Sequence, residues 1–583
     1  MRVSRPPRLA TFLSSFLDPR RAILAALIAV VTVLAIVPVF FLVWNSFKAT
    51  SGYEFGNLSL TADWTIRNFT DAYSDPRAFK MLGDSFFFSF GAMITAFILG
   101  GVLAFLVERT NMPFRNAVYG FMFVPLALPG ILKAIAWILI LSPKIGLLNQ
   151  LWFGMGFTQP LFNAYTIPAM FWVEGLSMSP LTFLMLGAAL RVMDPSLEEA
   201  AYTSGSGRWS TLGRITLRLM TPALAAIALL QFIRGLSVFE VPLIMGLPYG
   251  IQVFATNIYY AVREVQPPQY GHGFAYSMAI ILISVAGLLV YQRVMRHSER
   301  YATVTGKGFR PRIMDLGKWR PLAGAFAIFF SLVTVFLPFA ILLWASFLLV
   351  YEMPTGEALS RLTWANYEQL FGESEFMVSI KNTLIMGGSV AIGAMGLSII
   401  ISWMVIRLRT RYTALLDYIV FVPYAVPSIA VGLAFMVFFL SFPNPIYGSI
   451  WILVLAYLVH FLPIGTRFTH TAVGQVRVEL EEAASISGAN LFTMLRRIIV
   501  PLILPSLVAG GLFIFLLTVK VMSIAMLLYS TGSNVLPVLI LQYWKDGSIG
   551  LTSALSVVML TALVIIIILS RVLIQRRSIR VTE

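Results

Sequence analysis

Long apolar runs recur along the chain and predict its architecture. The first run, residues 22–44, contains no charged residue and would cross about 30 Å of hydrocarbon at about 1.5 Å per residue. It is too long for the core of a signal peptide, and no small-residue cleavage site follows it, so we expect a retained span. Further runs lie at 86–107, 117–141, 165–190, 221–245, 274–291, 322–347, 384–406, 412–440, 448–465, 501–528 and 551–569. The pattern predicts about twelve spans, half of them on each side of a basic segment at 293–320.

Composition agrees with a membrane protein. Of the 583 residues, 58% are hydrophobic and 12% are charged, whereas soluble chains carry roughly a quarter charged residues. The absence of cysteine excludes a disulfide framework, iron–sulfur ligation and thiol catalysis. We therefore expect an all-α integral membrane protein with about twelve transmembrane helices.

The distribution of lysine and arginine predicts the orientation. The net charge is +16, and with the N-terminus inside, 30 of the 42 basic residues face the cytoplasm, 9 face outward and 3 lie within spans. This bias follows the positive-inside rule and places both termini of a multi-pass inner-membrane protein in the cytoplasm. Because the basic excess is an orientation signal, we expect membrane lipid, and not nucleic acid, to contact these basic residues.

The second half of the chain repeats the first in order. The matching sets are Pro38, Trp44, Ser46 and Phe47 with Pro338, Trp344, Ser346 and Phe347; Phe-Val-Pro at 123–125 with 421–423; Pro180 with Pro463; and Leu-Glu-Glu-Ala-Ala at 197–201 with 480–484. An even number of spans per half gives both halves the same orientation. The sequence therefore predicts two parallel repeats related by an axis along the membrane normal.

A short signature occupies the inner loop between the fourth and fifth spans of each half. Its residues are Glu198, Glu199, Ala200, Ala201 and Gly205 in the first copy and Glu481, Glu482, Ala483, Ala484 and Gly488 in the second. Strong helix formers followed by glycine predict a short amphipathic helix with a sharp exit, suited to a soluble partner. The spacing resembles the EAA loop of ABC importer permeases. The second copy also has the proline of that pattern, Pro501, where the first has Arg218.

The resemblance implies a coupling role. In that family the loop inserts into a groove of an ATP-binding subunit, so two loops imply two ATPase copies on one fused permease. The chain contains no G-x-x-x-x-G-K-[ST] motif, so we expect no enzyme activity, catalytic residue or cofactor on it, with ATP and Mg²⁺ on the partner. The expected units are a cytoplasmic segment at 1–21, permease domains at 22–292 and 321–574, a basic cytoplasmic linker at 293–320 and a cytoplasmic tail at 575–583.

Two further stretches resemble the fused permeases of the ferric-iron importer branch. They are Phe-Glu-Val-Pro at 239–242 and the outer stretch Gln-Pro-Pro-Gln-Tyr-Gly at 266–271. The resemblance implies ferric iron as substrate and a periplasmic or lipid-anchored solute-binding protein as outer partner. Relatives in that branch import polyamines such as putrescine, sulfate, thiamine and phosphonates, so these and sugar phosphates remain open.

Ionisable residues in or near the spans are candidates for the translocation path, because a charge at mid-membrane costs a few kcal/mol or more. They are Lys133, Glu174, Arg234, Glu240 and Lys520, and their sum of +1 favours an anionic or anion-chelated solute. The paired prolines Pro125, Pro129, Pro423 and Pro427 should bend or interrupt the third span of each half, and the carbonyls this frees must face protein or a wet cavity. The histidines show no metal-ligand spacing, so we expect no metal site.

Two alternatives to an ATP-driven importer exist. Parallel six-span halves also describe the major facilitator fold of ion-coupled secondary transporters, but the loop from Glu108 to Arg115 lacks the Asp-Arg signature of that fold. A membrane scaffold without a transport role would leave the in-span charges unexplained. The sequence therefore favours the importer permease.

Overall fold

The computed structural model describes residues 19–49, 63–193, 196–298, 313–442 and 444–582. Within these ranges the secondary structure is helical apart from two isolated β-bridges, Lys48 with Trp64 and Thr110 with Met314. Ten helical segments are long and apolar enough to cross a membrane, and two bent helix pairs would bring the total to twelve. The prediction of an all-α bundle with about twelve spans is confirmed.

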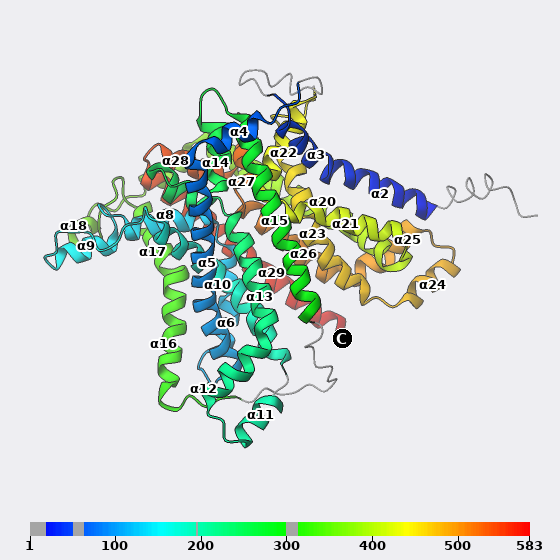
Figure 1. The fold of residues 1–583 in the computed structure, drawn as a ribbon, viewed down its shortest axis with the longest axis horizontal. Helices are drawn as coiled ribbons and strands as arrows, with labels where there is room; N and C mark the ends of the chain where they lie inside the picture. The colour runs from blue at the N-terminus through cyan, green and yellow to red at the C-terminus, as the bar shows by residue number, and fades with distance from the viewer. Residues whose placement is uncertain (1–18, 50–62, 194–195, 299–312, 443, 583) are drawn as a thin grey trace, which may run out of the picture.

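Each half contains a set of long helices that form its membrane spans (Figure 1). In the first half they are α2 (Pro19–Ala35) with α3 (Val37–Ser46), α5 (Pro76–Arg109), α10 (Ile167–Val192), α13 (Leu217–Leu236) and α15 (Tyr270–Ser298). In the second half they are α16 (Arg320–Ser331) with α17 (Leu337–Ser346), α20 (Ser374–Leu408), α23 (Ile450–Gly474), α26 (Val500–Lys520) and α29 (Ile549–Thr582).

Shorter helices connect these spans. In the first half they are α4 (Arg67–Ser74), α6 (Arg115–Phe121), α7 (Phe123–Ala127), α8 (Gly130–Leu141), α9 (Leu147–Gly154), α11 (Ser196–Thr203), α12 (Arg208–Thr211) and α14 (Phe254–Tyr259). In the second half they are α18 (Gly356–Leu359), α19 (Ala365–Gly372), α21 (Arg411–Ala425), α22 (Ser428–Leu440), α24 (Val478–Ile486), α25 (Leu491–Met494), α27 (Ser523–Leu528) and α28 (Leu536–Lys545).

The third span of each half is sharply bent. The helix axis turns by 99° between the segment Arg115–Leu126, which comprises α6 and most of α7, and α8, and by 106° between α21 and α22. Pro129 and Pro427 occupy the N-cap positions of α8 and α22, with ψ of 142° at both. Proline cannot donate a backbone hydrogen bond and pushes the preceding residue out of the helical region, so each helix stops and restarts there. Pro125 and Pro423 lie inside the helices just before the bends.

The fifth span of each half is shorter than its apolar run. The prediction of one continuous span over 221–245 and over 501–528 is wrong, because α13 ends at Leu236 and α26 ends at Lys520. After α26 the chain is extended at Val521 and resumes as α27. The apolar composition continues through both interruptions, so hydropathy alone does not reveal them.

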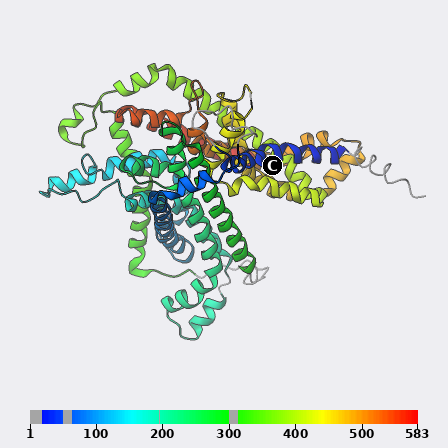
Figure 2. The ribbon, with the colours of Figure 1, turned by 45° about the horizontal axis from the view of Figure 1, so that its top comes forward.

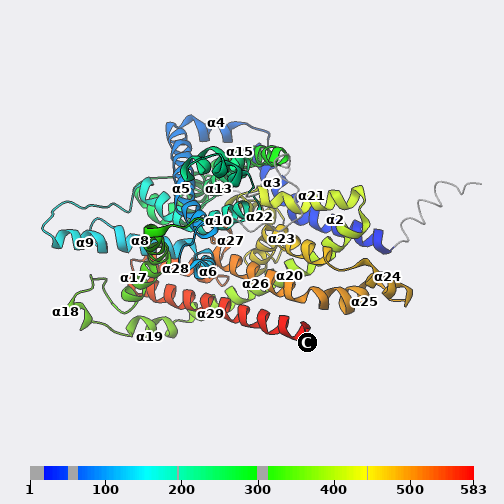
Figure 3. The ribbon, with the colours of Figure 1, turned by 90° about the horizontal axis from the view of Figure 1, so that it is seen from below.

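Each half packs its first span against the other half. α2 packs on α21 and α3 on α22, while α17 packs on α8 as well as on α29 of its own half. In Figures 1 and 2 two arms diverge from a shared region around α3, α14, α22 and α27. α11 lies at the tip of the arm formed by α5, α10 and α13, and α24 lies toward the tip of the other arm. Figure 3 shows α29 running beside α26 and α28, which it contacts.

Candidate functional site

The two EAA segments fold into short helices, α11 and α24. Acidic residues occupy the first turn of both, where they complement the positive end of the helix dipole. Gly205 and Gly488 follow with φ of +82° and +79°, a backbone conformation that side chains beyond glycine rarely adopt. The sequence pattern thus predicts both the helices and the sharp turns that end them.

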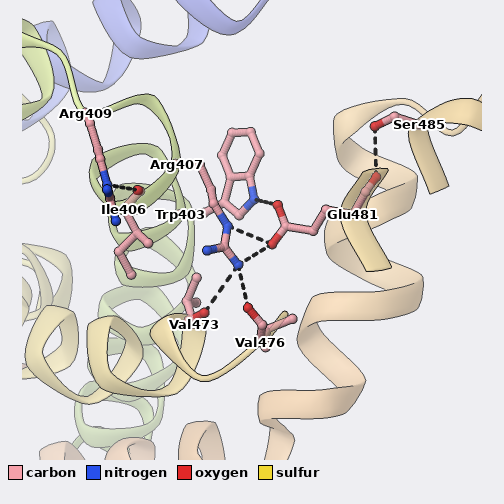
Figure 4. Close-up of polar contacts among 8 residues, drawn as sticks. All are labelled: Trp403, Ile406, Arg407, Arg409, Val473, Val476, Glu481 and Ser485. Carbon is pink, nitrogen blue, oxygen red and sulfur yellow. Dashed lines mark hydrogen bonds and ion pairs between the residues drawn. The ribbon is translucent and has the colours of Figure 1, made fainter. Parts of the chain in front are cut away.

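The first glutamate of each motif anchors its helix. Glu481 is 6% exposed and accepts hydrogen bonds from Arg407 Nε and Nη2 at 2.9 and 2.6 Å and from Trp403 Nε1 at 3.1 Å. Arg407 Nη2 also donates to the Val476 carbonyl at 2.9 Å. Figure 4 shows the guanidinium between the carboxylate of Glu481 and the end of α23. This charged contact fixes α24 to the end of α20.

The first half has an equivalent but weaker anchor. Arg109 Nη1 lies 3.4 Å from Glu198 Oε2, and Arg109 Nη2 donates to the Leu190 carbonyl at 3.0 Å. Thr216 Oγ1 donates to Glu198 Oε1 at 2.7 Å. Arg109, Glu198 and Glu481 are buried, whereas Arg407 is partly exposed.

Sequence reasoning missed these arginine–glutamate pairs. From the sequence, Arg109 and Arg407 count only toward orientation, and Glu198 and Glu481 belong to the coupling signature without a partner inside the chain. The repeat itself carries the signal, since Arg407 follows Arg109 at the same offset of 298 that relates the Phe-Val-Pro motifs. A charged residue kept at one position of both repeats points to a shared partner.

The rest of each motif alternates between the protein and the surface. The residues Glu199, Ala200, Glu482 and Ala483 are exposed, whereas Ala201 and Ala484 are buried beside the anchoring glutamates. Large apolar side chains are also exposed around α24, notably Ile486 at 88% and Phe492 at 70%. An exposed apolar patch with a polar rim is typical of an interaction surface.

The five in-span ionisable residues form one cluster. Each of Lys133, Glu174 and Lys520 interacts electrostatically with the others and with Arg234 and Glu240. They come from α8, α10, α13, the segment after α13, and α26. The sequence identified each residue separately, but only the fold places them together.

Two of the lysines bind carbonyls at the bend of the first half. Lys133 Nζ donates to the Pro125 carbonyl and to Ser177 Oγ, both at 3.0 Å. Lys520 Nζ, from the second half, donates to the Leu126 carbonyl at 2.8 Å. Carbonyls freed at a helix break need a donor inside a membrane, and these lysines supply it.

At the helix break of the second half, Glu240 accepts a hydrogen bond from the backbone, whereas the lysines donate to the backbone at the bend of the first half. Its Oε1 accepts a hydrogen bond from the Met522 amide at 3.1 Å, just beyond the end of α26, where Tyr457 also donates to the Val521 carbonyl. A Cβ at Gly130 would lie 3.1 Å from Glu240 Cβ, so glycine allows this close approach. The Lys520–Leu126 and Glu240–Met522 contacts, which we call the cross-brace, therefore join each half to the break of the other.

The remaining two charged residues of the cluster make fewer hydrogen bonds. Arg234 donates one hydrogen bond, from Nη1 to Gln231 Oε1 at 3.2 Å. Glu174 is 8% exposed and makes no hydrogen bond or ion pair with any residue that the structure describes. Over the same residues no group of three or more His, Cys, Asp or Glu could hold a metal ion.

A second contact between the halves lies near α14 and α28. Glu264 pairs with Lys545 at 2.5 Å and accepts from the Tyr259 hydroxyl at 2.6 Å. Burial opposes the charged form of Glu264, but the hydrogen bonds from Lys545 and Tyr259 outweigh it and hold its pKa below the usual 4.5. Nearby, Arg263 Nη2 donates to the Leu527 carbonyl at 2.5 Å. We call the Glu264–Lys545 pair the latch.

Comparison with known proteins places these features in context. A family model described as "Binding-protein-dependent transport system inner membrane component" matches residues 96–303 and, a second time, residues 394–580. The chain is 27% identical over 500 residues to the ferric transport system permease protein FbpB of Actinobacillus pleuropneumoniae, covering 84% of this chain and 70% of that protein. It is 23% identical over 474 residues to the Fe(3+)-transport system permease protein FbpB 2 of Haemophilus influenzae, covering 81% and 85%.

Proposed function

Because the chain belongs to the family of binding-protein-dependent transport system inner membrane components and carries that domain twice, we propose that it is the fused permease of an ATP-driven ferric-iron importer. As a family member with its apolar helices, it is a multi-pass inner-membrane protein and the membrane component of an ABC transporter. The observation that supports iron is the similarity over most of the chain to permeases named for ferric transport.

The proposal includes two copies of a separate ATPase, docked on α11 and α24. Support comes from the buried anchors Glu198 and Glu481, which hold each helix, and from the exposed motif residues that leave a surface for a partner. ATP and Mg²⁺ would bind on that partner, because the chain has no phosphate-binding loop. The termini and the basic linker would lie on the same cytoplasmic side, following the distribution of lysine and arginine.

A solute-binding protein would dock at the opposite end, and transport would proceed by alternating access. The two arms that carry α11 and α24 diverge, whereas the cross-brace and the latch join the halves elsewhere. This arrangement is compatible with a path closed toward the binding protein. Drawing the coupling helices together would then change the contacts between the halves.

A small anion or a polyamine is the alternative solute for the same machinery. A putative 2-aminoethylphosphonate permease, PhnV of Salmonella typhimurium, is 25% identical over 247 residues, which is 42% of this chain. The ion-coupled secondary transporter has no such support, since the family match is to binding-protein-dependent systems.

Radioactive uptake tests the proposal. Cells lacking their own iron importers would express this chain with its ATPase and solute-binding protein, and ⁵⁵Fe uptake would be compared with that of labelled phosphonate and sulfate. We expect energy-dependent ⁵⁵Fe uptake that disappears when the motif is disrupted by Glu482→Lys. Import of a labelled anion without ⁵⁵Fe would contradict the iron assignment and leave the permease assignment intact.

A further inference from the structure

We propose that Glu174 and Arg234 contact the solute in transit, and that iron crosses this chain as a complex with a small oxyanion ligand. This inference rests on the proposed function. Glu174 would face the metal side of such a complex, and Arg234 would donate to the carboxylate or phosphate oxygens of its ligand. The protein would thus recognise both ends of one neutralised species.

The first argument is that two of the five charged groups in the cluster have few or no hydrogen bonds within the chain. Lys133 and Lys520 donate to backbone carbonyls, and Glu240 accepts from a backbone amide, so these three stabilise helix breaks. Glu174 makes no hydrogen bond or ion pair with a described residue although it is 8% exposed. A largely buried carboxylate without a hydrogen-bonded partner on the chain is available to a group of the solute.

Arg234 is the complementary free group. One of its N–H groups donates to Gln231, whose own amide is fixed by Thr182 Oγ1 at 2.6 Å and the Met178 carbonyl at 3.3 Å. Gln231 therefore orients the guanidinium, and the other N–H groups of Arg234 make no hydrogen bond to the described part of the chain. A guanidinium with spare donors fits a planar oxyanion.

The second argument weighs against bare Fe³⁺. A hard cation prefers several oxygen ligands, and among the described residues no group of three or more His, Cys, Asp or Glu lies close enough together to hold a metal ion. Glu174 also interacts with Lys133, Arg234 and Lys520, whose positive charges would repel an uncompensated trivalent ion. A metal that brings ligands and their negative charge with it would avoid this repulsion.

The third argument comes from the repeat. The second-half counterparts of Glu174, Arg234 and Glu240, at the offset of 283, are Tyr457, Leu517 and Ser523, and the first-half counterpart of Lys520 is Ser237. The charges occur once, which fits one solute site on a pseudo-symmetric path.

Dual-label uptake tests the inference in cells making the complete transporter. Iron would be supplied as ⁵⁵Fe with ¹⁴C-citrate or with ³³P-phosphate. In the wild type we expect the anion label to enter with ⁵⁵Fe in a constant ratio. Arg234→Gln should lower uptake of both labels about tenfold or more, because charge-assisted hydrogen bonds are strong, while Arg234→Lys should retain part of it. Glu174→Gln should lower ⁵⁵Fe uptake.

Controls separate a solute contact from a folding defect. Arg320→Gln removes one exposed arginine at the start of α16 and should transport as wild type. Copurification of the ATPase reports on the fold of each variant, and the label ratio in the wild type needs no variant. Entry of ⁵⁵Fe without the anion, or normal uptake by Arg234→Gln and Glu174→Gln, would overturn this inference and leave the importer assignment standing. Absence of ⁵⁵Fe uptake by the wild type from both complexes would overturn the proposed function itself.

Discussion

Replacing Glu481 with glutamine should loosen α24 without unfolding the protein. The change removes the negative charge that Arg407 faces, while glutamine can still accept one hydrogen bond. Breaking a fully buried ion pair costs about 3–5 kcal/mol. Arg407 keeps its bond to the Val476 carbonyl, and its side chain is 14% exposed, so water can reach part of it. We therefore expect a local loss of about 2 kcal/mol, which corresponds to a roughly 30-fold increase in opening.

Amide hydrogen exchange of the purified protein measures this opening. Exchange should accelerate by roughly that factor in α24 and remain unchanged in the buried part of α20. Glu482→Gln is the matched control, because Glu482 is the next residue, carries the same charge and is exposed. It should leave α24 exchange at the wild-type rate. Equal effects of the two substitutions would show that the buried pair does not anchor the helix.

A double-mutant cycle with Arg407→Met sharpens the test. If the pair acts as a unit, the double variant should be less destabilised than the sum of the two single variants. Additive effects would refute the pairing. The same cycle on Arg109 and Glu198 should give a smaller coupling energy, because their single contact is 3.4 Å long whereas Arg407 donates twice to Glu481.

Two further predictions concern the motif turn and the latch. Gly488→Ala should destabilise the turn after α24 by about 1 kcal/mol, because the residue has a φ of +79°. Gly488→Asn should destabilise the turn less. Amide hydrogen exchange of residues 487–490 measures the difference, and equal exchange rates in both variants would count against a strained turn. The latch should persist above pH 4.5, the usual pKa of Glu264, and weaken as the pH falls through the lower folded pKa, since protonation removes the charge that Lys545 meets. Spin labels on either side of it, in a chain with no native cysteine, should give a broader distance distribution in acid, and an unchanged distribution would contradict this.

The spans were predictable because membranes impose a simple rule on sequence. Every backbone group in hydrocarbon must be bonded within its own helix, so long apolar runs have few other structures available. The bends at Pro129 and Pro427 were predictable for the same reason, since proline removes a donor. The end of α26 at Lys520 was not, because no proline marks it and its freed groups are bonded by Glu240 and Tyr457 from distant segments.

Prediction of the site from the sequence has a similar limit, which concerns how the charged residues are used. The cost of a charge in the membrane identified Lys133, Glu174, Arg234, Glu240 and Lys520 one by one, and only the fold places them in one cluster. Their sum of +1 was a poor guide to the solute, because summing assumes that all the charges are available. Once both lysines are assigned to carbonyls and Glu240 to an amide, one carboxylate and one guanidinium remain. That balance suits a complex of a cation with an anion better than a free anion.

The cross-brace and the latch differ in strength, and the difference bears on the proposed mechanism. The latch joins side chains that are 48% and 32% exposed, and such pairs contribute about 0–1 kcal/mol. Each bond of the cross-brace involves a charged group away from bulk water and should contribute about 1.5–3 kcal/mol. Of these two contacts, the cross-brace therefore resists separation of the halves more strongly. Its bonds end on helix breaks, where backbone can rotate, so movement of α26 relative to α7 can release them without disturbing the long helices.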